Sequence, residues 1–335
     1  MTGAAPDTVT SENDLASQVL AGDRRALARA ITLIESERAD HQEEAETLLR
    51  TLLPATGKAL RLGISGAPGV GKSTFIEAFG LHLIGQGKKV AVIAVDPTSR
   101  RSGGSILGDK TRMEKLARSD QAFIRPSPAG GTLGGVARRT REAMLLCEAA
   151  GYGVVIAETV GVGQSETAVA AMVDMFLLLI APGGGDELQG IKRGIVELAD
   201  LVLVNKSDGD LEPAAGRIAA EYAGALSLLR PATPNWQPTV QQCSALEDRG
   251  IVRAWETVEA HQRALSESGA LQDLRARQSR DWMWSEVTEE ALASLRGDAG
   301  VVAALPDLER KVGLGEMLPG AAARAIVAAY RRGRK

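Results

Sequence analysis

The chain is poor in the residues that disulfide-rich and metal-binding proteins need. Its 335 residues include two cysteines, Cys147 and Cys243, too few for a disulfide framework or a cysteine-based metal site. This low count is typical of a reducing compartment. The three histidines, His41, His82 and His261, are far apart in the sequence, so we expect them on helix surfaces. Aromatic residues make up only 3% of the chain, so the core must consist mainly of Ala, Val, Leu and Ile.

Strong charge and long apolar runs are missing as well. The formal net charge is −3 at pH 7, which excludes nucleic-acid binding driven by charge. No apolar run approaches the length that crosses a membrane, and no basic start followed by an apolar segment is visible. We therefore expect a cytoplasmic protein without nucleic-acid or membrane partners.

One segment matches the phosphate-binding P-loop pattern G-x-x-x-x-G-K-[ST]. It is Gly66-Ala67-Pro68-Gly69-Val70-Gly71-Lys72-Ser73, followed by Thr74. The backbone N–H groups of such a loop point at phosphate oxygens, Lys72 would reach the β- and γ-phosphates, and the Ser73 hydroxyl would hold Mg²⁺. Residues 60–65 indicate a buried strand and residues 74–84 a helix, whose dipole favours a bound anion. This context favours a nucleotide site over a glycine-rich turn.

Apolar segments and helical patterns alternate after residue 57 and predict an α/β fold. Continuous apolar runs are typical of parallel strands that are buried on both faces. They are residues 60–65, 89–95, 153–157, 174–180 and 200–204, with weaker candidates at 121–125 and 239–243. We predict a P-loop NTPase domain over 57–265, with a mostly parallel sheet covered by helices. Helical patterns predict an N-terminal extension over 1–56 and a C-terminal arm over 266–335, which packs on the domain or pairs with another chain.

A second motif, Asn205-Lys206-Ser207-Asp208, follows the apolar run 200–204 and fits N-K-x-D, the guanine-reading motif of GTPases. The Asp208 carboxylate would accept hydrogen bonds from guanine N1–H and the 2-amino group. Adenine lacks these donors, so it would leave the carboxylate unpaired. Lys206 can lay its stem against the base, and Asn205 can brace the neighbouring loop. A polar turn is the alternative, but a position downstream of a P-loop favours guanine recognition.

The segment Ser244-Ala245-Leu246 follows the candidate strand 239–243. It resembles the S-A-[LK] loop of GTPases, whose backbone supports guanine O6. Alone it means little, but its place in the order of motifs predicts a part in nucleotide binding.

Carboxylates at strand ends are the candidates for binding metal and water. Glu158 ends the run 153–157 and stands where many GTPases have the Asp of D-x-x-G, so it would bind Mg²⁺ through water while the Gly161 N–H senses the γ-phosphate. Asp96 ends the run 89–95, and Asp109 follows in a Gly/Ser-rich loop. Both can hold the water shell of the metal or orient the attacking water. Asp109 can also cap a helix over 110–117.

A flexible segment, Gly183-Gly184-Gly185, follows the run 174–180 and continues to Lys192. It is either a plain surface loop or a switch that brings Lys192 to the active site when a partner binds. Because Val162 rather than Gln follows Gly161, no Gln at that position orients water. We expect slow unassisted hydrolysis that a partner accelerates.

Together these segments resemble the MeaB/ArgK family of P-loop GTPases, of the SIMIBI class. They are GAPGVGKST (66–74), DPTSRRSGGSILGDKTRM (96–113), ETVGVGQSE (158–166), APGGGDELQGIK (181–192) and NKSD (205–208). The resemblance implies a GTPase that uses GTP/GDP and Mg²⁺. It further implies a chaperone that gates cobalamin loading and protects adenosylcobalamin-dependent methylmalonyl-CoA mutase. It also implies a homodimer joined through the C-terminal helices.

Three other functions remain as alternatives. A metallochaperone GTPase that delivers nickel should have a His- or Cys-rich tract, which this sequence lacks. A small-molecule kinase, as in the older arginine/ornithine transport label, should depend on an acceptor for turnover. A non-hydrolysing scaffold should bind nucleotide without single-turnover hydrolysis.

Overall fold

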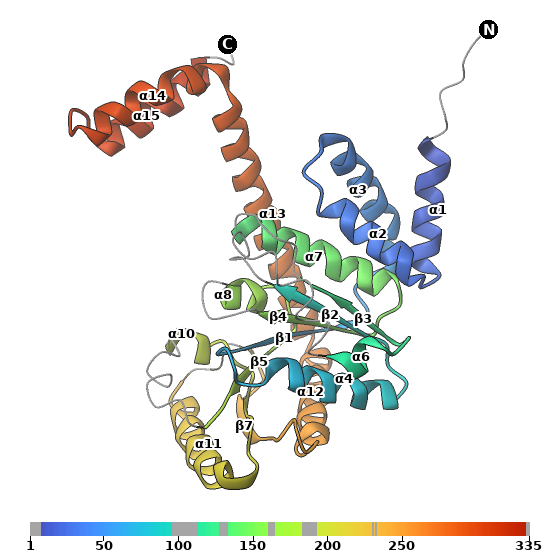
Figure 1. Ribbon diagram of the computed structural model, residues 1–335. Coiled ribbons are helices and arrows are strands. Elements are labelled where there is room, and N and C mark those ends of the chain that lie inside the picture. Colours follow the sequence, from blue (N-terminus) through green and yellow to red (C-terminus); the bar gives the residue numbers. More distant parts are fainter. Residues whose placement is uncertain are drawn as a thin grey trace. The chain divides into compact units, whose positions relative to one another are not determined.

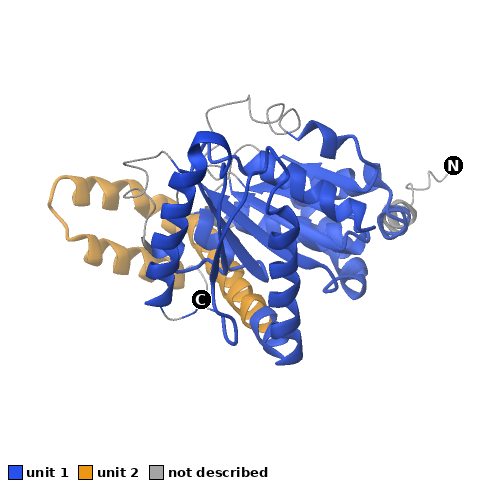
Figure 2. Cartoon of the chain, turned by 90° about the horizontal axis from the view of Figure 1, so that it is seen from below, with its two compact units in different colours: residues 1–275 blue, residues 276–335 orange. Residues whose placement is uncertain are grey.

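The computed structural model describes most of the chain in two compact units, residues 1–275 and 276–335 (Figures 1 and 2). The residues described are 8–95, 113–126, 133–159, 165–182, 193–229, 231 and 233–332. The predicted division of the chain at residues 56 and 265 stays a prediction.

A seven-stranded parallel sheet forms the centre of the first unit, in the order β3-β2-β4-β1-β5-β6-β7. The strands are β1 (Leu60–Gly66), β2 (Val90–Val95), β3 (Ala122–Arg125), β4 (Val154–Thr159), β5 (Met175–Ile180), β6 (Leu201–Val204) and β7 (Thr239–Gln242). All seven candidate strands and the parallel sheet are confirmed. The two weaker candidates are the edge strands β3 and β7, where a less apolar sequence is tolerated because one side of the strand has no neighbour.

Helices cover both faces of this sheet, as parallel strands require (Figure 1). One face packs against α4 (Lys72–Gly85), α6 (Glu114–Ala117) and α12 (Ile251–Glu267). The other packs against α7 (Leu133–Ala149), α8 (Ser165–Ala170), α10 (Arg193–Val196) and α11 (Glu212–Ser227). The N-terminal helices α1 (Thr8–Leu20), α2 (Arg24–Ile34) and α3 (Ala39–Leu52) share the core of that second face, next to α7. Burial of their apolar stripes therefore holds them to the nucleotide domain.

The second unit consists of helices. The long helix α13 (Ala270–Gly297) begins in the first unit and continues in the second, followed by α14 (Ala299–Gly313) and α15 (Pro319–Arg332). The Asp298 carboxylate caps α14 by accepting from the Gly300 and Val301 N–H groups at 2.9 and 3.1 Å. Within the described residues, no helix combines the length and apolar character needed to cross a membrane.

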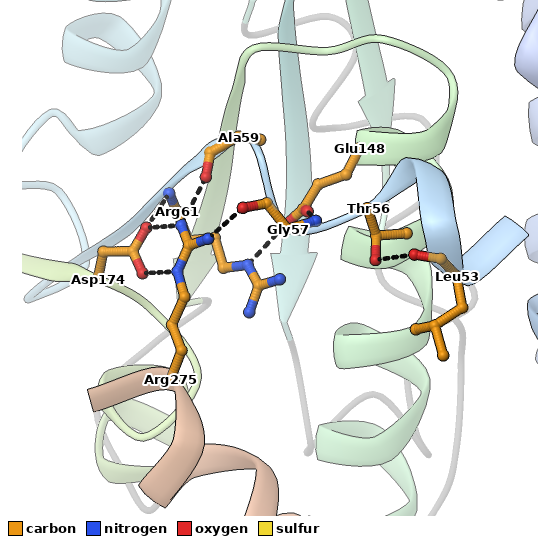
Figure 3. Close-up of polar contacts among 8 residues, drawn as sticks. All are labelled: Leu53, Thr56, Gly57, Ala59, Arg61, Glu148, Asp174 and Arg275. Carbon is orange, nitrogen blue, oxygen red and sulfur yellow. Dashed lines mark hydrogen bonds and ion pairs between the residues drawn. The ribbon is translucent and has the colours of Figure 1, made fainter. Parts of the chain in front are cut away.

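A buried ion pair fixes the start of α13 to the amino-terminal ends of β1 and β5 (Figure 3). Arg275 Nε and Nη2 donate to the two oxygens of Asp174, at 2.8 and 2.7 Å. The remaining donors reach the backbone, with Nη1 2.6 Å from Gly57 O and Nη2 2.7 Å from Ala59 O. The Asp174 side chain is only 2% exposed, so its charge depends on this guanidinium for compensation.

The same cluster ties the segment before β1 to the end of α7. Arg61 donates from its backbone N to Asp174 Oδ2 at 2.8 Å and from Nε to Glu148 Oε1 at 2.6 Å. The other oxygen of Glu148 accepts from the Gly57 N–H (Figure 3). Each buried carboxylate thus has both a charged and a backbone donor, the arrangement that makes buried charge tolerable.

Replacing Arg275 with Ala should destabilise the protein by about 3 kcal/mol, because it leaves the Asp174 carboxylate buried without its charged partner. Arg277, an exposed residue two positions along the same helix, offers a matched control as Arg277→Ala. Urea denaturation followed by circular dichroism measures both variants. Equal stability of Arg275→Ala and Arg277→Ala would show that the Asp174–Arg275 pair does not stabilise the fold more than an exposed arginine does.

The expectation that His261 lies on the surface is wrong. Its side chain is completely buried, on the face of α12 that also carries Ile251, Ala254, Trp255, Val258 and Leu265. The helical spacing of these apolar residues places position 261 on the sheet side, and this periodicity was visible in the sequence. The ring packs edge-on against Trp236, with centroids 5.0 Å apart. Neither ring nitrogen has a hydrogen-bond partner among the described residues.

Burial has opposite consequences for the two titratable groups at this position. Desolvation lowers the pKa of His261 to about 4 and raises that of Asp200 to about 6. The His261 Nε2 and Asp200 Oδ1 atoms are 3.9 Å apart. Asp200 also accepts from the Thr233 hydroxyl at 2.6 Å and from the Phe176 N–H at 2.9 Å.

His261 should therefore make the fold sensitive to acid. Below the ordinary histidine pKa of 6.5 the unfolded chain takes up a proton that the folded ring refuses, so stability falls from pH 6.5 towards pH 4. Asp200 acts in the opposite direction, because its folded form takes up a proton first. His261→Leu removes only the effect of the histidine. As the pH is lowered from 7 to 5, the free energy of unfolding of the variant, relative to that of the wild type, should therefore rise by about 2 kcal/mol. Denaturation at several pH values measures this difference, and parallel curves for the two proteins would contradict it.

Candidate functional site

The P-loop connects the carboxyl end of β1 to the amino end of α4, as the motif requires. Gly66 ends the strand, and Gly71 precedes the helix with a φ of 93°. Neither position tolerates a side chain. A Cβ on Gly66 would lie 2.3 Å from Leu179 O, and one on Gly71 would lie 2.6 Å from Asn205 Nδ2. The glycines of the motif thus permit a close approach of β5 on one side and of the N-K-x-D loop on the other.

Lys72 lies against the loop's own backbone. Its Nζ donates to Gly66 O at 2.7 Å and to Ala67 O at 3.2 Å, and the residue is 9% exposed. The ammonium is thus held over the segment whose N–H groups bind phosphate in proteins with this motif. This position fits the role predicted for Lys72 on the terminal phosphates.

Ser73 and Glu158 are brought together from two elements. The Ser73 hydroxyl, in the first turn of α4, donates to Glu158 Oε1 at 3.4 Å. Glu158 lies near the end of β4, is 5% exposed, and pairs in register with Ile64 of β1 and Ala94 of β2. A hydroxyl and a carboxylate are oxygen ligands of the kind that Mg²⁺ prefers, so the two residues fit a metal beside the P-loop.

The other predicted metal ligands, Asp96 and Asp109, lie outside the described residues. So do Gly161, predicted to sense the γ-phosphate, and Lys192, predicted to reach the active site when a partner binds. Among the residues that are described, no group of three or more His, Cys, Asp or Glu side chains could hold a metal ion.

Asn205 joins the phosphate-binding and base-binding loops. The residue follows β6 and is 2% exposed. Its Nδ2 donates to Val70 O of the P-loop at 2.9 Å. Its Oδ1 accepts from the Ala245 N–H at 3.1 Å and from the Cys243 thiol at 3.6 Å. A single amide of the N-K-x-D segment thus contacts the two other segments that the sequence assigned to nucleotide binding, the P-loop and residues 244–246.

The residues assigned to the base lie around this amide. Lys206 has a φ of 57°, and its Cε lies 4.0 Å from where a Cβ on Gly71 would stand, so its stem passes near the P-loop. Asp208 is half-buried, and its carboxylate does not cap the 3-10 helix η3 (Gly209–Leu211) that follows. In the segment 244–246, which follows β7, Ser244 and Ala245 are buried, whereas Leu246 is 79% exposed.

One polar pair near the site was missed by the sequence reasoning. The Thr159 hydroxyl, at the end of β4, donates to the Ser65 hydroxyl of β1 at 2.8 Å, and both residues are buried. The pair ties together the two strand ends that carry the P-loop and residues 160–164. Hydroxyl residues at or next to the carboxyl ends of two mainly apolar strands were the signal that could have found it.

Comparison with known proteins assigns the family. A family model described as "Methylmalonyl Co-A mutase-associated GTPase MeaB" matches residues 27–299. The chain belongs to this family. As a member of the MeaB family it is a P-loop GTPase that binds guanine nucleotides and hydrolyses GTP.

Similar proteins match over nearly the whole chain. A "Putative GTPase" of Caulobacter vibrioides is 56% identical over 319 residues, covering 95% of this chain and 97% of that protein. The "Methylmalonic aciduria type A homolog, mitochondrial" of Mus musculus is 50% identical over 320 residues, covering 92% of this chain and 77% of that protein. The crystal structure of an "LAO/AO transport system kinase" aligns with a TM-score of 0.78 and 41% identity, covering 97% and 99% of the two chains. These matches extend the MeaB-family likeness through both helical ends.

Asp208→Asn should transfer the preference of this MeaB-family protein from guanine to xanthine nucleotides. Xanthine presents a carbonyl at position 2, which an amide can donate to. GTP loses two charge-assisted hydrogen bonds, so its affinity should fall on the order of a hundredfold. Competition binding with GTP, ATP and XTP measures the change, and Asp210→Asn, two residues along, serves as control. Equal affinity of the wild-type protein for ATP and GTP would contradict the role of Asp208.

Proposed function

We propose that this GTPase is a chaperone of adenosylcobalamin-dependent methylmalonyl-CoA mutase, gating cobalamin loading and protecting the mutase. The observation that carries the proposal is the match of residues 27–299 to a family whose description names the mutase. The likeness to a methylmalonic aciduria type A homolog over 92% of the chain supports the same partner.

The arrangement of the site supports a metal-assisted hydrolysis. Lys72 would contact the β- and γ-phosphates, while Ser73 and Glu158 would hold Mg²⁺, with Asp96 and Asp109 completing its shell. The metal would neutralise charge on the phosphates when bound. These carboxylates cannot themselves stabilise the negative transition state, so unassisted turnover is slow, and a partner that brings in Lys192 accelerates it.

The sheet order supports communication between nucleotide and partner. β4 and β5 are the two neighbours of β1, the strand that leads into the P-loop. Glu158 and Thr159 are the last residues of β4, and the predicted switch segment 183–192 comes after β5 in the sequence. The carboxyl ends of β4 and β5 therefore lie on either side of the strand end that leads into the P-loop, so a γ-phosphate bound there would act on the chain that continues from them.

The helical second unit supports a homodimer. Its own core is small, because among residues 276–332 only Val301 of α14 and Ala322 and Ala329 of α15 are buried. Eight large apolar side chains are exposed on the described part of its helices and their connection. They are Met283, Trp284, Val287, Leu292, Val302, Leu314, Leu318 and Val327. A second copy of the chain would cover them.

The test is GTP turnover of the full-length protein with and without purified mutase, followed by light scattering of the mixture. We expect mutase to raise turnover at least tenfold, a small part of what activating partners of other GTPases supply. A complex that contains two copies of this chain is also expected. Lys72→Ala, which removes the phosphate contact, controls for contaminating hydrolysis.

Two outcomes would reject the proposal. Unchanged turnover together with no complex would remove the mutase as partner. Turnover that depends on arginine or ornithine, rather than on the mutase, would favour the small-molecule kinase instead.

A further inference from the structure

We propose that Arg249 is a positioning residue for guanine recognition. Its guanidinium joins the two base-binding loops and fixes the peptide bond that precedes Asp208. The proposal rests on the proposed role of Asp208 in reading guanine. Arg249 belongs to none of the motifs found in the sequence.

The loop that carries Arg249 is closed on itself. The Ser244 N–H donates to Arg249 O and the Arg249 N–H donates to Ser244 O, both at 3.0 Å. Inside the loop, the Ser244 hydroxyl accepts from the Glu247 N–H at 3.2 Å. Gly250, with a φ of 78°, ends the turn where a Cβ would lie 2.6 Å from Gln242 O. The backbone of Arg249 is therefore fixed in position before its side chain makes any contact.

The guanidinium of Arg249 reaches three acceptors in three segments. Its Nη2 donates to Ser207 O, in the N-K-x-D loop, at 2.6 Å. Its Nε lies 2.9 Å from Glu247 Oε2, in its own loop, and its Nη1 lies 3.5 Å from Glu212 Oε1, at the start of α11. The three side chains are about half exposed, so solvent screens these two ion pairs. Their role is to orient the planar fork so that Nη2 points at the Ser207 carbonyl.

Ser207 is consequently held at three atoms. Its N–H donates to Cys243 O at 3.0 Å, its hydroxyl donates to Gln242 Oε1 at 2.8 Å, and its carbonyl accepts from Arg249. The preceding residue, Lys206, has a left-handed φ of 57°, which residues other than glycine adopt only when their surroundings impose it.

Fixing the Ser207 carbonyl also restrains the position of Asp208. The carbonyl of Ser207, the N–H of Asp208 and the Asp208 Cα share one planar peptide group, so anchoring the carbonyl restrains the position from which the Asp208 side chain leaves the backbone. Asn205 anchors the first half of the motif to the P-loop and to Ala245. Arg249 anchors the second half, which carries the carboxylate that would contact guanine.

The experiment compares binding of GDP and IDP, because hypoxanthine lacks the 2-amino group that Asp208 would recognise. Arg249→Gln should lower the affinity for GDP about tenfold, the usual effect of losing a hydrogen bond to a charged group. It should lower the affinity for IDP less. The GDP:IDP affinity ratio should therefore fall. Arg253→Gln, an exposed arginine four residues along on α12, should keep the wild-type ratio. Thermal melting without nucleotide confirms that each variant folds.

Asp208→Asn and Arg249→Lys complete the series. If Asp208→Asn keeps the wild-type ratio, the proposed role of Asp208 fails, whatever Arg249 does. Suppose that Asp208→Asn lowers the ratio but that Arg249→Gln leaves it unchanged, either because binding is unaffected or because GDP and IDP binding weaken equally. Positioning by Arg249 is then overturned, while guanine recognition by Asp208 stands. Lysine cannot span the three acceptors, so Arg249→Lys should give an intermediate ratio. Should Arg249→Gln not fold, a wild-type ratio in Arg249→Lys would overturn the proposal.

Discussion

The contact between Asn205 and the P-loop is the interaction on which the rest of the site depends. One buried amide donates to Val70 O in the P-loop and accepts from the Ala245 N–H, so a single side chain joins the P-loop to the segment 244–246, which was predicted to support the base. The contact is possible because β1 and β6, which flank β5, run in the same direction, so the loops that follow them lie at the same end of the sheet. It also requires glycine at position 71, since any Cβ there would collide with the amide.

The two ends of the sheet have different roles. At the carboxyl ends of the strands lie the loops that bind nucleotide, as is general for open parallel sheets. At the amino ends, the Asp174–Arg275 pair and its neighbours hold the segment before β1, the end of α7 and the start of α13 together (Figure 3). The nucleotide loops are thus built on strands whose opposite ends are restrained by buried charge.

Much of the fold was predictable because the secondary structure favoured by each segment of the sequence is the one that the tertiary structure contains. The apolar runs became strands, since only a sheet covered on both faces accommodates them. The P-loop glycines and the N-K-x-D tetrapeptide were identifiable because phosphate and guanine recognition demand particular residues at fixed spacing. His261 shows the limit of reading residues one at a time. A polar residue suggested a surface position, but the apolar periodicity of α12 placed it in the core.

The sequence by itself determined the class of fold, the order of the nucleotide motifs and the family to which they belong. The fold class, the order of the motifs and the family can be read from short sequence patterns, because each pattern lies within one continuous segment. Only the tertiary structure decided which side chains from distant segments meet. The Ser73–Glu158 contact, the Ser65–Thr159 pair and the Arg249–Ser207 bond each join residues far apart in the chain. Strand order and register bring such residues together, and neither quantity is encoded in any one segment, because both result from the packing of all of them.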